Sequence, residues 1–160
     1  MFRRIDDFAA QWSYESDSTL KVVRSLTDAS LSQAIVPGGR TLGFLAWHIA
    51  AALSTMTRQF GLEVESPGDA ESVPQRATDL VTGYERTAGS VLEQVKRRWT
   101  DERLTEDVPF FGRTIPAGVA LDVLIKHQAH HRGQMTVYLR LMGAKVPAIY
   151  GPSADDNSFK

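Results

Sequence analysis

Apolar residues recur at spacings of three and four along most of the chain, which is the period of a helix with one buried face. The first stripe begins at Ile5 and the second at Leu42, where Thr41 is a suitable N-cap and Gly61 a suitable stop. The members of the two stripes are Ile5, Phe8, Trp12, Ser16, Thr19, Val23 and Leu26, and then Leu42, Leu45, His48, Ala52, Met56 and Phe60. The pattern predicts two amphipathic helices before Gly61.

Two further stripes follow in the second half of the chain. Residues 72–75 combine the spacing of a capping box with an early proline, Pro74, so they predict the start of a third helix. A fourth helix is predicted to begin at about Pro116 and to end at Gly143. The stripe residues are Leu80, Tyr84, Ala88, Val91, Val95 and Trp99, and then Ala120, Leu124, His127, His131, Met135, Tyr138 and Met142.

The segments between these helices favour a bundle without a sheet. Residues 108–112 could extend briefly, but Pro109 and Gly112 favour a loop there. The polar segment 61–72 is long enough to cross one end of a bundle, so neighbouring helices need not be antiparallel. We therefore predict an all-α four-helix bundle over residues 1–145, followed by an irregular tail over residues 146–160.

Composition narrows the function more than the fold. The 160 residues suffice for one domain, and 42% hydrophobic with 23% charged residues is typical of a soluble globular protein. A formal net charge of -1 provides no broad basic surface, so we expect no nucleic-acid partner. The first residues lack the apolar region of a secretory signal, and no apolar run is long enough to span a membrane, so we expect a cytoplasmic protein. Because the chain has no cysteine, any metal must be held by His, Asp or Glu.

The histidines are the candidate chemistry of this chain. Of the four, His127, His130 and His131 lie close together, and His127 and His131 share one helix face. Both continue an apolar stripe, as His48 does in the second helix, so we expect all three to point inward. They could converge on one divalent ion, and imidazole suits zinc, nickel, iron or manganese. The alternative is that they are ordinary packing histidines, and His130 is expected on the surface or at an interface.

Three segments together resemble a known family. Residues 127–134, continued by 138–143, resemble the C-terminal signature of the DinB/YfiT-like family, and residues 45–50 and 146–151 resemble two other parts of it. The resemblance covers nearly the whole chain. It implies a four-helix bundle of up-down-down-up topology, a divalent metal held by His48, His127 and His131, and a homodimer.

Residues beside the histidines have their own interpretations. Gly133 costs about 1 kcal/mol relative to Ala inside a helix, so we expect close helix packing there. Arg132 either pairs with a carboxylate of a neighbouring helix or subunit, or is solvated. Gln134 either hydrogen-bonds a ligand histidine or is an ordinary polar flank. Ser16, Thr19 and Tyr84 are inward polar residues, some of which could line a pocket beside the metal.

The resemblance also implies what the site does. Characterised members of such families include transferases that join a low-molecular-weight thiol to an electrophilic small-molecule substrate, and also hydrolases and isomerases. Bacillithiol, mycothiol or glutathione would be the co-substrate of a transferase, and a metal-activated thiol or water suits such a site. The alternative is a non-enzymatic, dimeric, stress-related module that binds a metal or small ligand. The sequence assigns no catalytic residue.

Overall fold

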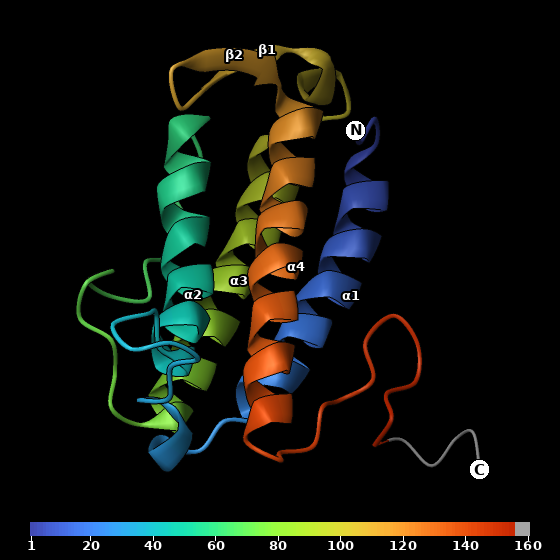
Figure 1. Ribbon diagram of the computed structural model, residues 1–160. Helices are drawn as coiled ribbons and strands as arrows, with labels where there is room; N and C mark the ends of the chain where they lie inside the picture. The colour runs from blue at the N-terminus through green and yellow to red at the C-terminus, as the bar shows by residue number, and fades with distance from the viewer. Residues whose placement is uncertain (156–160) are drawn as a thin grey trace.

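The computed structural model describes residues 1–155, which form four long α-helices and a small hairpin (Figure 1). The helices are α1 (Ile5–Arg24), α2 (Leu42–Gln59), α3 (Ala77–Arg98) and α4 (Ala117–Leu141). The hairpin joins β1 (Asp107–Phe110) to β2 (Arg113–Pro116), and short 3-10 helices cover Asp28–Ser30 and Glu102–Thr105. The predicted four-helix bundle is therefore confirmed, with the hairpin as an addition.

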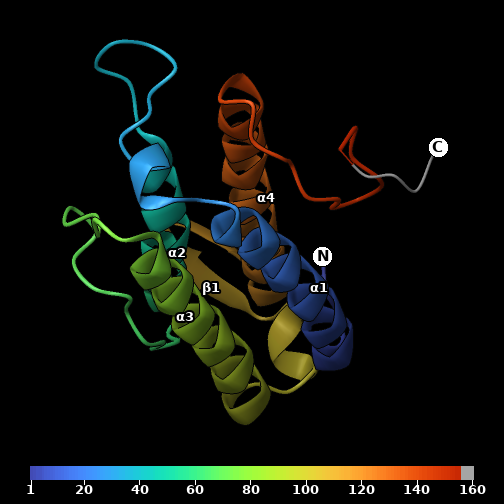
Figure 2. The ribbon, with the colours of Figure 1, turned by 90° about the horizontal axis from the view of Figure 1, so that it is seen from below.

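The helices run in the up-down-down-up order. In Figure 1, α1 and α4 descend from the hairpin end of the bundle, whereas α2 and α3 rise toward it. Residues 60–76 make this order possible because they return along the bundle between the parallel helices α2 and α3 (Figure 1). α1 packs against α3 and α4, and α2 packs against the same two helices, so α1 and α2 lie diagonally opposite (Figure 2).

Most residues of the predicted stripes form the core. Phe8, Trp12, Ile49, Tyr84 and Leu124 are almost fully buried between the helices. The Trp12 indole donates its Nε1 hydrogen to the Ala88 carbonyl oxygen at 3.0 Å, so its polar atom is satisfied inside the core. The α2–α4 contact, which brings together the stripes containing the three histidines, is part of this core.

The third helix begins later than the sequence predicts. α3 starts at Ala77 rather than near residues 72–75, and the Ala77 backbone N–H donates to the Asp28 carboxylate at 2.7 Å. The Ser72 hydroxyl instead donates to Asp69 within the preceding loop. The sequence pattern at residues 72–75 was misleading because the cap comes from the 3-10 helix at Asp28–Ser30, 49 positions earlier in the chain.

The predicted loop at residues 108–112 is wrong, because these residues form most of a hairpin. Phe111 and Gly112 have positive φ values of 47° and 74°, as a two-residue type I′ turn requires. Pro109 lies opposite Thr114, one pair away from the hydrogen-bonded pair that closes the turn. Its missing N–H therefore costs the ladder no bond, and the hairpin tolerates the proline.

The chain after α4 is anchored although it forms no helix or strand over residues 144–155. The Tyr14 hydroxyl donates to the Ile149 carbonyl oxygen, and the Asp155 carboxylate accepts from the Val146 N–H. Of the predicted tail, residues 156–160 lie outside the described residues. Among the helices described, none combines the length and hydropathy needed to cross a membrane.

Candidate metal centre

The three predicted histidines meet where α2 packs against α4. His48 lies in the middle of α2, and His127 and His131 lie one turn apart on α4. The antiparallel contact of the two helices brings the single histidine opposite the pair. Phe44, one turn before His48, stacks on it with ring centroids 5.7 Å apart and planes 8° apart, so this aromatic neighbour helps to hold the imidazole in place.

The three imidazoles are close enough to share one ion. The ring centroids are 5.1 Å apart for His48 and His127, and 4.6 Å apart for each of the other two pairs. One nitrogen from each ring lies within 4.8 Å of the others. Metal–imidazole bonds of about 2.1 Å require only a modest contraction from this spacing. His131 is buried and the other two are half-buried, so the site is open to one side.

Hydrogen bonds define which ring nitrogens are available. The carboxamide oxygen of Gln134 lies 2.8 Å from Nδ1 of His131, while its nitrogen lies 3.2 Å from Nε2 of His130. Because that oxygen can only accept, Nδ1 of His131 carries the proton and Nε2 keeps its lone pair. Nδ1 of His127 is buried and has no hydrogen-bond partner among the described residues. An orphaned buried imidazole nitrogen fits a metal ligand set better than a packed core.

The surroundings keep these histidines neutral. Burial, followed by the charges of the neighbouring histidines, lowers the pKa of His127 to about 4. Burial is also the main reason why the pKa values of His48 and His131 lie below the usual range, and the nearby Arg40 cation lowers both further. The neutral imidazole is the form that binds a metal. His130 is exposed and lies outside the group, as expected for a surface histidine.

Of the predictions for residues next to the three histidines, called the triad from here on, the one for Arg132 is confirmed and the one for Gly133 is wrong. Arg132 pairs with a carboxylate of a neighbouring helix: its guanidinium lies 2.7 Å from Glu15 of α1, and both side chains are buried. Arg132 also contacts the Tyr150 hydroxyl, which ties the C-terminal segment to the same pair. The expected close packing at Gly133 is wrong, because Gly133 is exposed and a Cβ there would meet nothing within 4 Å.

Sequence reasoning missed a buried amide next to the triad. The Gln128 side-chain oxygen accepts from the Tyr84 hydroxyl at 2.7 Å and from the Thr19 hydroxyl at 3.2 Å. Gln128 follows His127 and therefore faces away from the triad, toward α1 and α3. The sequence did not predict that Gln128 is a buried hydrogen-bond acceptor, because glutamine side chains are usually exposed.

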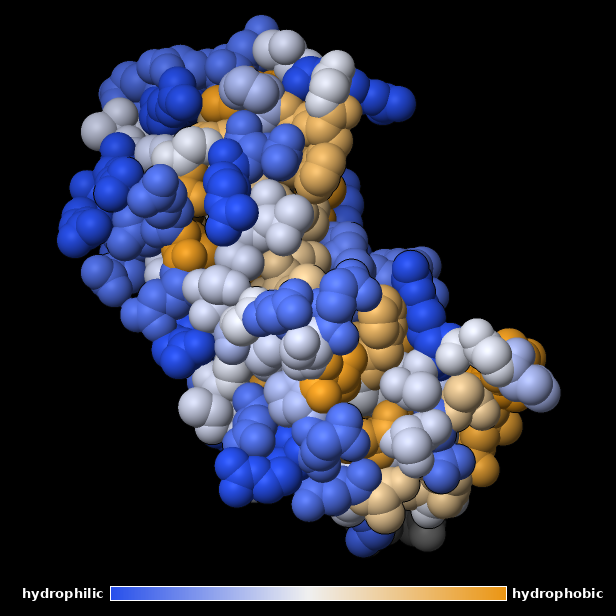
Figure 3. All heavy atoms as spheres, turned by 90° about the vertical axis from the view of Figure 1, so that its left-hand side faces the viewer, coloured by the Kyte–Doolittle hydropathy of each residue, from blue (hydrophilic) through white to orange (hydrophobic). Residues whose placement is uncertain are grey.

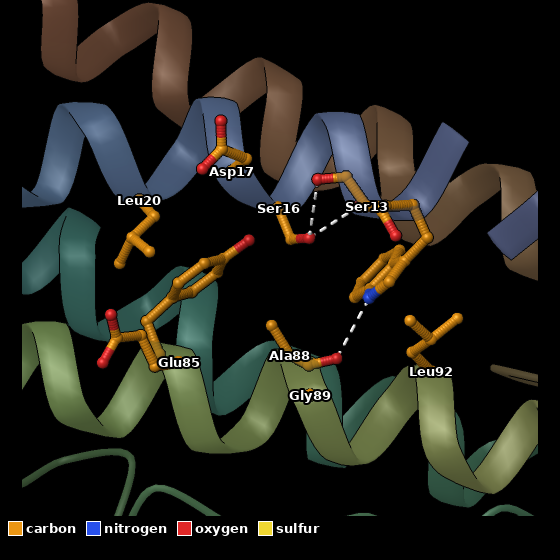
Figure 4. Close-up of a pocket in the computed structure, with 10 residues that line it drawn as sticks. Ser13, Ser16, Asp17, Leu20, Glu85, Ala88, Gly89 and Leu92 are labelled. Carbon is orange, nitrogen blue, oxygen red and sulfur yellow. Dashed lines mark hydrogen bonds between the residues drawn. The ribbon is translucent and has the colours of Figure 1, made fainter. Parts of the chain in front are cut away.

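Ser16, Thr19 and Tyr84 do not lie beside the triad. Ser16 and Tyr84 line a separate groove between α1 and α3, and Thr19 is fully buried. Figure 4 shows this groove, with Ser13, Ser16 and Asp17 on one side and Glu85 on the other. The suggestion that some of them line a pocket beside the metal is therefore wrong.

One pocket is lined by His48 and His127, and a second lies next to Gln134, the residue that contacts His131. The first, named here the hairpin pocket, has a volume of about 470 Å³ and is lined by His48, Ala51, Ala52, Thr55, Met56, Ala70, Phe110, Phe111 and His127. The second, the Arg40 pocket, has a volume of about 370 Å³ and is lined by Ile35, Arg40, Leu45, Gln134, Val137 and Tyr138. In Figure 3 the molecular outline is hollowed between the hairpin end and the opposite end, and apolar side chains gather near the hairpin. A small molecule can thus approach the histidines.

Known proteins resemble this chain over nearly its whole length. Residues 1–158 match the DinB family. The uncharacterized protein YrdA of Bacillus subtilis (strain 168) is 40% identical over 156 residues, which cover 98% of this chain and 93% of YrdA. A crystal structure of a DinB-like protein from Bacillus cereus ATCC 10987 has a TM-score of 0.90 and 43% identity, and covers 94% of this chain and 100% of that one.

A more distant structure shares the fold. YfiT from Bacillus subtilis has a TM-score of 0.65 and 18% identity, over 88% of this chain and 89% of YfiT. YfiT is described as a probable metal-dependent hydrolase with an unusual four-helix bundle topology. At this identity the likeness concerns the arrangement of the helices.

Proposed function

This chain belongs to the DinB family, and on that premise we propose that it is a divalent-metal-dependent hydrolase whose ion is held by His48, His127 and His131. The observation that carries the proposal is the convergence of three neutral imidazoles beside an open pocket. YfiT, which shares the fold, is described as a probable metal-dependent hydrolase, and this supports the same reaction class.

Three neutral donors suit a reactive metal better than a structural one. They leave the charge of the ion uncompensated and leave coordination positions open. A divalent ion in such a donor set supplies Lewis acidity, which polarises a carbonyl and makes water or a thiol a usable nucleophile at neutral pH. The same donor set suits zinc, nickel, iron or manganese.

The chain itself supplies orientation and a dry environment. Gln134 holds the ring of His131 through Nδ1, and Phe44 stacks on His48. Phe110 and Phe111 wall the hairpin pocket with apolar surface, which excludes water around a bound substrate. In the proposed reaction water adds across an acyl C–O or C–N bond, so that the acyl carbon gains a hydroxyl and the leaving group gains a proton.

Thiol transfer is the second candidate. The specific observation in its favour is that a second pocket lies next to Gln134, which contacts His131, in addition to the pocket lined by His48 and His127. One pocket would hold the electrophilic substrate and the other a low-molecular-weight thiol.

The predicted homodimer also stays a prediction, which a measurement of molar mass in solution tests.

One activity screen separates these candidates. Zinc-, nickel-, iron- and manganese-loaded protein is assayed against aryl esters and N-acyl amino acids, and separately against an electrophile with bacillithiol, mycothiol or glutathione. A hydrolase releases acid without thiol, and His48→Ala abolishes the release. Turnover only with a thiol would replace hydrolysis by transfer, and inactivity of every loaded form in both assays would favour a non-enzymatic module.

A further inference from the structure

The two pockets beside the triad differ sharply in chemistry. The hairpin pocket is almost entirely apolar: besides the imidazoles of His48 and His127, only the Thr55 hydroxyl is polar among its lining side chains. Phe110 and Phe111 close it from the hairpin, and Met56 closes it from α2. Such a lining stabilises an aromatic or alkyl group by removing its surface from water.

The Arg40 pocket contributes one exposed cation. Arg40 is exposed and makes no ion pair within residues 1–155. Its guanidinium lies 5.0 Å from the centroid of the Phe44 ring, and Phe44 in turn stacks on His48. The Tyr138 hydroxyl donates to the Arg40 carbonyl oxygen at 2.6 Å, which fixes the backbone at this position. The guanidinium therefore lies over Phe44, the ring that stacks on His48, without an ion-pair partner in residues 1–155.

No acidic side chain balances this charge at the site. Neither pocket has an aspartate or glutamate among its described lining residues. The triad is neutral, so the guanidinium and a divalent ion together make the region strongly positive. A ligand with a negative group satisfies this field, whereas a neutral or cationic ligand does not.

The backbone at the start of α2 indicates which anion fits. The N–H groups of Leu42, Gly43 and Phe44 are all bonded, to Gln33, Leu31 and Thr41 respectively. The Arg40 pocket thus offers a single guanidinium and no free helix-terminal donors at these positions. One planar guanidinium forms a bidentate pair with either a carboxylate or a phosphate, but the further oxygens and second charge of a phosphate dianion would find no helix-terminal donor at these positions, so a carboxylate fits better.

We propose that the substrate joins an apolar acyl or aryl group, held in the hairpin pocket, to a carboxylate held by Arg40, with the bond to be cleaved between them at the triad. This inference rests on the proposed function, because it places the reacting bond beside the histidines. N-acyl amino acids, and similar amides or esters, combine an apolar group and a carboxylate in this way.

Calorimetry with a matched pair of probes tests the proposal. N-phenylacetylglycine carries both groups, and its methyl ester lacks the charge; each is titrated into metal-free and zinc-loaded protein. Arg40→Gln should weaken binding of the acid about fivefold to tenfold and leave the ester unchanged. Phe111→Asn, which suits the left-handed turn position, should weaken both probes about threefold or more through lost apolar contact.

Controls make the result specific. Arg58→Gln removes an exposed positive charge from α2, outside both pockets, and should leave both probes unaffected. Phenylacetamide and acetate, added together, should each bind more weakly than the joined probe. The proposal would be overturned if the wild type and Arg40→Gln each bound the acid and the ester equally well. It would also be overturned if the matching phosphonate bound more tightly than the acid, or if the separate fragments bound as tightly as the joined probe.

A parallel zinc titration separates this inference from the proposed function. Arg40→Gln and Phe111→Asn should retain the zinc stoichiometry of the wild type, because neither residue is a ligand. If zinc binds normally but the probes ignore Arg40, the substrate class is wrong and the metal site stands. If the metal-free protein distinguishes the probes as expected but never takes up a divalent ion, the pocket chemistry stands and the metal-dependent function fails.

Discussion

The carboxamide oxygen of Gln134 lies 2.8 Å from Nδ1 of His131, one turn along the same helix. This contact fixes the proton on Nδ1 and leaves the lone pair of Nε2 available to a metal ion. Gln134→Ala should therefore weaken zinc binding about 10-fold to 100-fold, while the helical circular dichroism stays unchanged. Gln11→Ala, an exposed glutamine of α1, is the control, and equal zinc affinity in the two variants would show that the contact is incidental.

The buried pair of Arg132 and Glu15 should be costly to break from one side. Arg132→Met leaves a buried carboxylate without its partner, so the free energy of unfolding should fall by about 3–5 kcal/mol in denaturant titrations. The double variant Arg132→Met with Glu15→Met should recover most of this loss. Arg76→Ala, which breaks the exposed pair with Asp79, should cost under about 1 kcal/mol, and a loss at Arg132 no larger than that would contradict the account.

Acid should destabilise the metal-free protein through His127. The unfolded chain protonates this residue below about pH 6.5, whereas the folded chain, with its pKa lowered to about 4, does not. The unfolded state then binds more protons between these values, so stability falls as the pH drops from about 6.5 toward 4 and is unaffected above that window. In His127→Gln, melting temperatures should decline less over this window than in His130→Gln; parallel declines would show that His127 is not the group responsible.

Two exposed glycines should respond oppositely to alanine. Gly112 has a φ of 74° in the hairpin turn, so Gly112→Ala should cost about 1 kcal/mol or more. Gly89 lies in α3, where an added methyl group would meet nothing within 4 Å, so Gly89→Ala should raise stability by up to about 1 kcal/mol. The comparison is a thermal melt of both variants, and a stabilising Gly112→Ala would mean that the turn is not left-handed.

The sequence predicted those features that depend on local periodicity. The apolar stripes of α2 and α4 placed His48, His127 and His131 on buried faces, and the structure brings these three side chains together. The start of α3 could not be predicted in the same way, because Asp28 supplies the cap from a 3-10 helix far away in the sequence. The hairpin was missed because Pro109 is unfavourable in most strands and is tolerated here only by the pairing register.

The two pockets could not be predicted from the sequence for a related reason. Arg40 comes from the loop before α2, and Phe111 from a hairpin turn at the other end of the same helix. Both are exposed residues outside any periodic stripe, so neither carried a sequence signal. Only the packing of α2 against α4 brings the Arg40 pocket next to Gln134 and the hairpin pocket against His48 and His127.

The metal content of purified variants tests the central claim most directly. Protein stripped with EDTA is titrated with zinc, nickel, iron and manganese, and bound metal is measured by mass spectrometry after desalting. The wild type and His130→Ala should each retain one ion per chain of at least one of these metals, and His48→Ala should bind it about 100-fold more weakly or not at all. A wild type that retains none of the four ions, or a His48→Ala variant that retains as much as the wild type, would contradict the three-histidine site.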